Sequence, residues 1–390
     1  MVDLFVGVLL FVAIVIGWLL GKTERKKRAP VEPSFGVGKE YFDGLNLLLN
    51  EKQDEAVDLL LKTLDVNGDT FETHIVMGSL FRRRGEVDRS IRIHQDLLAR
   101  SDLNKAQHSA VKLELARDYL KAGVLDRSER LLKEIAEENN LNQVKALEYL
   151  LTIYEQEREW LQCIEVAEKL IAKGKSLQIG LAHYHCELAE QGLKLGDYVQ
   201  VRREVKKAQQ ADKCCVRATM ILAELETEAN NHGEAVKVLR KVLDQDPAFV
   251  PDTLPLLHDN YEKLGHMSEL SKYLFECLEK TPAISIVIEL SDLVTQLEGE
   301  QSGAFVLSEY LKKRPSVKGL DRLISLQMSR AEGDEKDNLG ILQAFTQKLI
   351  KDKPIYRCTE CGFDGKTLHW KCPTCKTWGA VRPIQGLEGE

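Results

Sequence analysis

Four cysteines near the C-terminus have the spacing of metal ligands. Cys358 and Cys361 form one Cys-x2-Cys pair, and Cys372 and Cys375 form a second pair after ten intervening residues. Two residues between cysteines let one tight turn direct both sulfurs at the same ion, and four thiolates complete the tetrahedral coordination of Zn²⁺. The pattern therefore predicts one structural zinc ion. Iron is the alternative, because four thiolates at a tetrahedral centre also hold iron.

The residues around these cysteines are basic and aromatic. Residues 353–382 hold six Lys or Arg and two Asp or Glu, together with Tyr356, Phe363, Trp370 and Trp378. A module of this size lacks a core, so metal binding contributes most of its folding energy. We expect some of its aromatic side chains to pack on the last helices of the preceding region. The same composition is compatible with RNA binding, in which a tryptophan would stack on a base.

The region before the module repeats with a helical period. Apolar residues recur at intervals of three and four, and turns are predicted at Gly85, Gly123, Gly196 and Gly265. A small or apolar residue recurs about every 34 residues, at Gly44, Gly78, Ala116, Leu151, Ala189, Ala223, His258 and Ser291. This period is that of tetratricopeptide repeats. It predicts an all-α solenoid over residues 39–352, in which residues 316–352 form the last helix pair, although a generic helical solenoid would have nearly the same shape.

Stacked helix pairs of this kind present a concave surface formed by the first helix of each pair. Projection onto those helices predicts a protein-binding groove with a basic entrance and an acidic remainder. The basic residues are Arg82, Arg83, Arg117 and Lys121, and the acidic ones are Glu148, Glu155, Glu190, Glu224, Asp259 and Glu262. The acidic balance of the long middle region argues against nucleic-acid binding along it.

The N-terminal residues are predicted to form a membrane anchor. Residues 4–20 contain no charged side chain, and five Lys or Arg follow within residues 22–28. A cleaved signal peptide would need its basic residues before the apolar run and small residues at its end. We therefore predict a single transmembrane helix over residues 1–21 and a basic flank and linker over residues 22–38. The basic cluster keeps the rest of the chain in the cytoplasm.

The remaining motifs do not indicate an enzyme. The sequence has no phosphate-binding loop, dinucleotide-binding fingerprint, zinc-protease motif or nucleophile elbow. Five further cysteines are scattered through the helical region, as buried side chains in a reducing compartment would be: Cys163, Cys186, Cys214, Cys215 and Cys277. A repeat scaffold without a catalytic constellation is predicted to bind other proteins.

The order of these parts resembles the lipopolysaccharide assembly protein B family of Gram-negative bacteria. The resemblance covers the whole chain: a short anchor, a Lys/Arg cluster, eight or nine tetratricopeptide units and the CTECG and CPTC pairs. It implies that residues 353–384 form a rubredoxin-like module, followed by a tail at 385–390. This sequence departs from true rubredoxin in the shorter interval between its pairs and in Lys376, where the second turn usually has Gly. Both departures weaken an inference of electron transfer.

The resemblance also implies a function. The family acts at the inner membrane as a non-enzymatic adaptor that promotes degradation, by the FtsH membrane protease, of the UDP-acyl-GlcNAc deacetylase of lipid A synthesis. An inner-membrane lipopolysaccharide sensor is implied as its antagonist, and other lipopolysaccharide assembly proteins as partners. The N-terminus would face the periplasm, and a homo-oligomer is compatible with this arrangement. The alternative is a generic repeat scaffold whose metal module transfers electrons or binds RNA.

Overall fold

The computed structural model describes residues 71–138, 140–351, 353–387 and 389, together with Val15 and Trp18. The predicted linker and the first predicted repeat unit, around Gly44, lie outside these residues, as does the predicted anchor except for Val15 and Trp18. No helix within the described ranges is long and apolar enough to cross a membrane.

The chain divides into two compact units, Met1–Leu131 and Leu132–Glu390. The first contains α4 (Phe71–Arg84), α5 (Val87–Leu98) and α6 (Lys105–Ala122), and α7 (Leu125–Glu137) crosses the boundary. The second begins with α8 (Gln143–Glu157), α9 (Trp160–Ala172), α10 (Gln178–Leu195), α11 (Tyr198–Ala211), α12 (Val216–Glu228), α13 (His232–Arg240), α14 (Val242–Gln245) and the 3₁₀ turn η2 (Pro247–Phe249). It continues with α15 (Val250–Leu264), α16 (Met267–Lys280), α17 (Ile284–Glu298), α18 (Glu300–Lys313), α19 (Val317–Met328) and α20 (Asp334–Lys351).

Small residues at the repeat positions let paired helices approach closely. Ala116, Ala189 and Ala223 are fully buried in first helices. A methyl group added to Gly78 would lie 2.4 Å from Nε2 of His94 on the partner helix. Ser90, twelve residues after Gly78, donates from Oγ to the Gly78 carbonyl at 2.7 Å. The tetratricopeptide-type architecture predicted from the period is confirmed for the described helices. The predicted turn glycines all follow helices and have φ between 71° and 88°.

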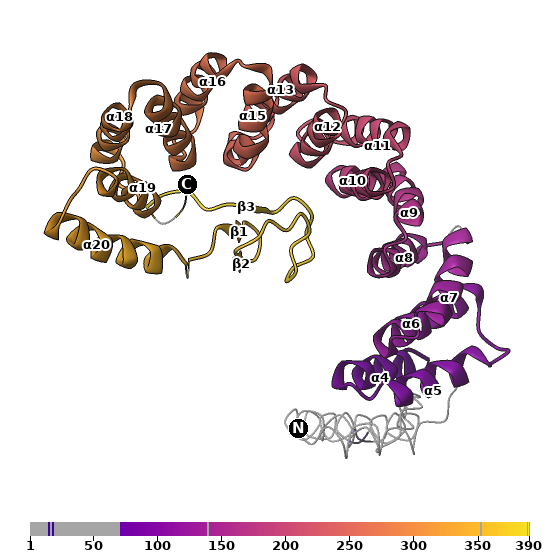
Figure 1. Cartoon of the computed structure of the whole chain (residues 1–390). Coiled ribbons are helices and arrows are strands. Elements are labelled where there is room, and N and C mark those ends of the chain that lie inside the picture. The colour runs from indigo at the N-terminus through magenta and orange to yellow at the C-terminus, as the bar shows by residue number, and fades with distance from the viewer. Residues whose placement is uncertain are drawn as a thin grey trace, which may run out of the picture. The chain divides into compact units, whose positions relative to one another are not determined.

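A three-stranded antiparallel sheet follows the helices, in the order β2 (Asp364–Gly365), β1 (Tyr356–Cys358) and β3 (Val381–Pro383). Within the second unit, the strands lie on the inner side of the curved row of helices that includes α10, α12, α15 and α17 (Figure 1). Leu368 and Trp370 of this module pack against a buried cluster whose residues come from α12 through α17, η2 included. The module therefore shares a core with the helices.

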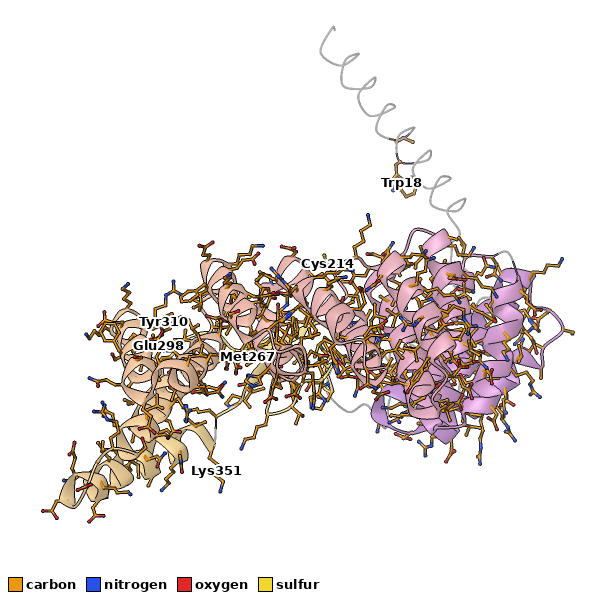
Figure 2. All side chains as sticks on the ribbon, turned by 45° about the horizontal axis from the view of Figure 1, so that its top comes forward. Trp18, Cys214, Met267, Glu298, Tyr310 and Lys351 are labelled. Atoms are coloured by element: carbon orange, nitrogen blue, oxygen red, sulfur yellow. The ribbon has the colours of Figure 1, made fainter. Side chains whose placement is uncertain are left out.

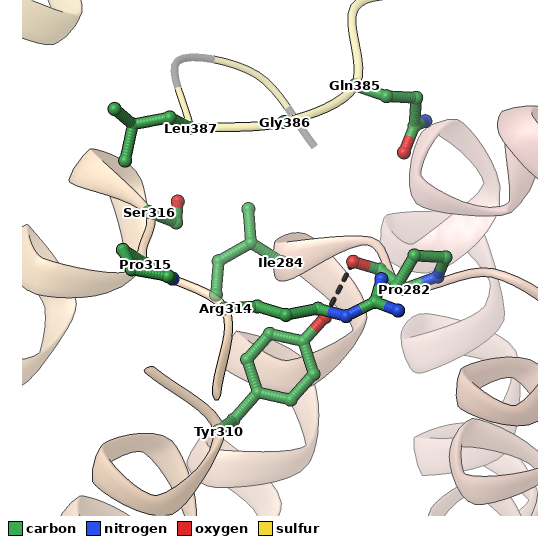
Figure 3. Close-up of a pocket in the computed structure, with 9 residues that line it drawn as sticks. All are labelled: Pro282, Ile284, Tyr310, Arg314, Pro315, Ser316, Gln385, Gly386 and Leu387. Atoms are coloured by element: carbon green, nitrogen blue, oxygen red, sulfur yellow. Dashed lines mark hydrogen bonds between the residues drawn. The ribbon is translucent and has the colours of Figure 1, made fainter. Parts of the chain in front are cut away.

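The chain's tail leads from β3 to the far helices. The Val317 amide donates to the Leu387 carbonyl at 3.1 Å, which fixes the tail to the start of α19. Residues 385–387 border a pocket of about 430 Å³ whose other walls come from the start of α17, the end of α18 and the segments next to them (Figure 3). In that pocket the Tyr310 hydroxyl donates to the Pro282 carbonyl at 2.6 Å. The tail and the module thus contact helices at different places along the second unit.

The cysteines outside the metal module are mostly buried, as the sequence predicts. Cys163, Cys186, Cys215 and Cys277 are buried, and Cys214 is exposed (Figure 2). The sulfurs of Cys186 and Cys215 are 3.8 Å apart, which is too long for a disulfide bond. These buried thiols therefore behave as small apolar side chains in the helix packing.

Candidate metal centre

Two similar turns hold the four predicted ligands. In the first, the Gly362 amide donates to the Cys358 carbonyl at 3.0 Å, and the Cys358 amide donates to Phe363 at 2.8 Å. In the second, the Lys376 amide donates to the Cys372 carbonyl at 3.0 Å, and the Cys372 amide donates to Thr377 at 2.9 Å. Each Cys-x2-Cys segment is therefore closed by the same pair of backbone hydrogen bonds.

The sulfurs are spaced for one tetrahedral ion. All four Sγ atoms lie within 4.8 Å of one another. Cys358 and Cys375 are 3.7 Å apart, and Cys361 and Cys372 are 3.6 Å apart. A tetrahedron with metal–sulfur bonds of about 2.3 Å has edges of about 3.8 Å, whereas a disulfide bond is only about 2.05 Å long. The cluster therefore fits a single thiolate-bound metal ion, and its geometry suits zinc and iron alike.

The protein stabilises the thiolate form of one ligand in particular. Oγ1 of Thr377 lies 3.3 Å from Sγ of Cys375. As a hydrogen-bond donor to the thiolate, this hydroxyl lowers the pKa of Cys375 to about 6. In the same cluster a backbone hydrogen bond from Phe363 lowers the pKa of Cys361, but desolvation and the three neighbouring sulfurs outweigh it and raise that pKa to about 12. The Thr377 hydrogen bonds therefore favour the thiolate, the form that binds metal, at Cys375.

The two turns have different residue types at one equivalent position, although the backbone there is left-handed in both. Gly362 has a φ of 73° and Lys376, its counterpart, has a φ of 62°. This left-handed conformation suits Gly and costs other L-residues roughly 1–2 kcal/mol. Lys376 compensates in part, because its Nζ donates to the Pro373 carbonyl at 2.6 Å.

Glu155 on α8 joins the module to the helices. Its Oε1 accepts hydrogen bonds from the Tyr184 hydroxyl at 2.6 Å and from Nε1 of Trp378 at 2.8 Å. Its Oε2 accepts from Nζ of Lys371 at 2.9 Å. The Glu155 side chain is only 16% exposed, so these three donors compensate a carboxylate that has lost most of its water.

Aromatic side chains form the rest of the contact. Trp378 stacks on His183 of α10 with ring centroids 5.1 Å apart and meets Tyr184 edge-on at 5.8 Å. Trp370 stacks on Phe249 of η2 at 5.6 Å. The expectation that the aromatic residues dock the module on the last helices was therefore wrong. They dock it on the middle ones, because aromatic partners and the Glu155 carboxylate lie there.

Charge complementarity extends this contact along β1 and β3. Arg382 pairs with Asp246 at 3.1 Å, and the Tyr356 hydroxyl donates to Asp252 on α15 at 2.5 Å. Burial next to Arg217 lowers the pKa of His183 to about 3, so the imidazole beneath Trp378 is neutral at physiological pH. The basic module is held against an acidic surface of the second unit.

Two of the four residues of the predicted basic entrance are paired with carboxylates within the first unit. Arg82 is buried and pairs at 2.6 Å with both Glu114 and Asp118. Burial opposes its charge, but hydrogen bonds to Asp118 and Glu114 outweigh that effect and raise the pKa of Arg82. Arg117 also pairs with Glu114 at 2.6 Å, whereas Arg83 and Lys121 are exposed. The projection overlooked these acidic partners.

The predicted acidic residues of the second unit have different environments. Glu155 binds the module, and Glu190 pairs with Arg217 at 2.8 Å. Glu148 pairs with Lys175 at 2.6 Å on the surface. Three further acidic side chains are exposed: Glu224, Asp259 and Glu262. Desolvation, together with the nearby charges of Glu190 and Glu228, raises the pKa of Glu224.

Several docking residues were missed by the sequence reasoning. None of Asp246, Asp252 and His183 is among the predicted binding residues. The signal that could have found them is charge: a basic, aromatic module follows an acidic helical region in the same chain. That pairing is visible in the sequence, although its position along the helices is not.

We predict that Cys372→Ser abolishes metal binding and unfolds residues 356–383, because the module has almost no core of its own. Elemental analysis should find one ion in the parent chain and none in the variant, while the helical circular dichroism signal persists. Cys214→Ser, which changes an exposed cysteine outside the cluster, should keep the ion.

The colour of the purified protein distinguishes the two metals. A colourless zinc protein would contradict electron transfer, whereas a red iron protein would contradict zinc.

The two turns provide a matched pair of substitutions. Gly362→Ala should destabilise the metal-loaded module by about 1–2 kcal/mol, because alanine is strained at positive φ. Lys376→Ala should change stability less, because the parent residue already bears a Cβ there and only the exposed Nζ hydrogen bond to Pro373 is lost. Chelator competition can compare the two variants, and equal losses of metal affinity would contradict the explanation.

Glu155→Ala should release the module from the helices. It leaves the buried Tyr184 hydroxyl, the half-buried Trp378 indole and the Lys371 ammonium group without their acceptor, at a cost of roughly 1–3 kcal/mol. Hydrogen exchange should then show faster exchange in residues 353–384. Glu148→Ala on the same helix removes only an exposed ion pair and should leave that exchange unchanged.

Two family models match separate parts of the chain. A family profile described as a rubredoxin metal binding domain matches residues 356–383, and one described as a tetratricopeptide repeat matches residues 73–106. A solved tetratricopeptide repeat protein from Parabacteroides merdae matches 67% of this chain and all of its own, with a TM-score of 0.33 and 14% identity.

Curated relatives match nearly the whole chain. Lipopolysaccharide assembly protein B of Escherichia coli strain K12 is 34% identical over 98% of this chain and 98% of its own length. The Haemophilus influenzae protein of the same name is 33% identical over 97% of this chain and 98% of its own. Identity at this level over the whole length shows common ancestry, and the chain belongs to the lipopolysaccharide assembly protein B family.

Proposed function

We propose that this protein is a non-enzymatic adaptor in lipopolysaccharide assembly. It would be tethered to the inner membrane by residues 1–21, with the repeat array and metal module in the cytoplasm. In this proposal it presents the UDP-acyl-GlcNAc deacetylase of lipid A synthesis to the FtsH protease, and an inner-membrane lipopolysaccharide sensor opposes it. The role in lipopolysaccharide assembly follows the name of its relatives, and the partners follow the family resemblance.

The observation that carries the proposal is the docked metal module. Four cysteine ligands leave a tetrahedral ion no open position for substrate, so the site suits a structural role. Contacts of Trp378, Lys371 and Arg382 hold the module on the helices of the second unit. This arrangement produces a composite surface of helices and sheet, as expected of a protein that binds other proteins.

The same contacts argue against RNA recognition by the module. Base stacking needs accessible aromatic faces. Trp370 lies on Phe249, and Trp378 lies between His183 and Tyr184. The cationic groups of Lys371 and Arg382 already have carboxylate partners in Glu155 and Asp246.

Membrane tethering would let the adaptor bring its partners together without a catalytic activity of its own. Confining two proteins to one surface raises their effective concentration and strengthens weak contacts. The exposed acidic side chains Glu148, Asp259 and Glu262 remain accessible in the second unit and are our candidates for partner contacts.

Deletion of residues 1–21 should abolish turnover of the deacetylase in cells while the remaining chain stays folded. Pulse-chase measurement at native expression gives the deacetylase half-life, and circular dichroism checks the fold. A chain carrying an unrelated single transmembrane helix is the matched control and should restore turnover if tethering is sufficient. A normal half-life after deletion would contradict the adaptor mechanism.

A further inference from the structure

The last helix, α20, carries apolar side chains on the face that its neighbour does not cover. Its other face packs on α19, where the buried Thr346 hydroxyl donates to Asp321 at 2.6 Å. On the same face Nε2 of Gln343 donates to Ser325 of α19 at 2.7 Å. Helical spacing places four apolar side chains in one stripe on the outward face, and each is more than half exposed: Ile341, Leu342, Phe345 and Leu349.

The position of α20 makes this apolar stripe unusual. The helix ends the row of helices and packs on α19 (Figure 1). The end helices of a repeat array normally have a polar outer face, which keeps the array soluble. A contiguous apolar stripe on such a face is typical of a surface that binds another molecule.

The charges of α20 complement a second copy of the same helix. Residues 334–337 hold three acidic side chains and one basic one, and residues 348–351 hold two basic ones. Residues 338–347 between them carry no charge. Two such helices in antiparallel orientation place the acidic end of each beside the basic end of the other, whereas a parallel pair would place like charges together.

Asp337 and Lys348 define the geometry of such a pair. They are eleven residues apart, which is close to three helical turns, so both lie on the same flank of the stripe. A two-fold axis that relates antiparallel helices brings each flank against the same flank of the second copy, so Asp337 of each copy meets Lys348 of the other. The point midway between the two residues is also the midpoint of α20 (Asp334–Lys351). The axis therefore passes the centre of the helix, where the stripe lies.

An anionic lipid surface fits this face less well. The carboxylates of the first turn, at one end of the stripe, would be repelled by anionic headgroups. A protein partner would need an apolar stripe with the reverse order of charges. An antiparallel copy of α20 has both features.

We propose that this protein forms a homodimer through an antiparallel pair of α20 helices related by a two-fold axis. The apolar stripes pack together across the axis, and two Asp337–Lys348 ion pairs border them. One face of an 18-residue helix buries less than the roughly 800 Å² per partner of a standard interface, so we expect micromolar affinity. This inference goes beyond the proposed function and does not rest on it, because the adaptor mechanism needs no contact between two copies.

Sedimentation velocity of the full-length, metal-loaded chain in detergent measures its mass at increasing concentration. The parent chain should change from monomer to dimer as its concentration rises to about 100 µM. Phe345→Asp places a charge in the stripe and should keep the chain monomeric. Phe275→Asp on α16 is the matched control, because Phe275 is 57% exposed and Phe345 is 62% exposed, and it should dimerise like the parent chain. A monomeric parent chain, a dimer that persists in Phe345→Asp, or loss of the dimer in Phe275→Asp would overturn the inference.

Charge reversal tests the orientation of the two helices. Asp337→Lys and Lys348→Asp should each weaken self-association roughly tenfold or more, because each places like charges together in the antiparallel pair. An equimolar mixture of the two variants should restore the parent affinity, because one then supplies two ammonium groups and the other two carboxylates. The double variant, which exchanges the two charges, should also dimerise. A mixture that associates no better than either variant alone would contradict the antiparallel pair.

Discussion

The contact between Glu155 and the metal module is the interaction that positions the module on the helices of the second unit. One carboxylate on α8 accepts hydrogen bonds from α10 and from two residues more than 200 positions later in the chain. Such a carboxylate is stable away from water only while its donors are in place. Two of those donors belong to a module whose four cysteines are grouped as metal ligands. We therefore expect metal binding, module folding and docking to be linked.

This link explains why an acidic helical region and a basic terminal module occur in one chain. The acidic face of the second unit binds side chains of the chain's own module: Glu155 binds Lys371 and Trp378, Asp246 binds Arg382, and Asp252 accepts from the Tyr356 hydroxyl. A partner protein would therefore meet a surface built from helices and sheet together. In the proposed adaptor, loss of the metal would change that surface without changing the helices themselves.

Local features of the fold could be predicted from the sequence. The period of about 34 residues predicted the helix pairs, and the Cys-x2-Cys spacing predicted the grouping of four cysteines that the structure contains. Both depend on neighbouring residues or on repeated packing, which a sequence records directly. The difference between Gly362 and Lys376 was also visible, and their positive φ values account for the usual Gly at such turns.

Long-range contacts were less predictable, for two reasons. Some contacts join adjacent repeat units: Arg82 and Asp118 are 36 residues apart, and Glu155 and Tyr184 are 29 apart. A search for charged partners about one repeat length away could therefore have revealed the partner of Arg82. The position of the module follows no such spacing. It depends on the curvature of the helix row, which brings Trp378 to Glu155 across 223 positions.

The most direct test of this account is a zero-length carbodiimide cross-link between Lys371 and Glu155, whose Nζ and Oε2 atoms lie 2.9 Å apart. Mass spectrometry of the full-length chain would quantify the isopeptide before and after removal of the metal by a chelator. The account predicts that the cross-link forms in the metal-loaded protein and is lost after chelation. The same yield in both states, or no cross-link in the loaded protein, would contradict it.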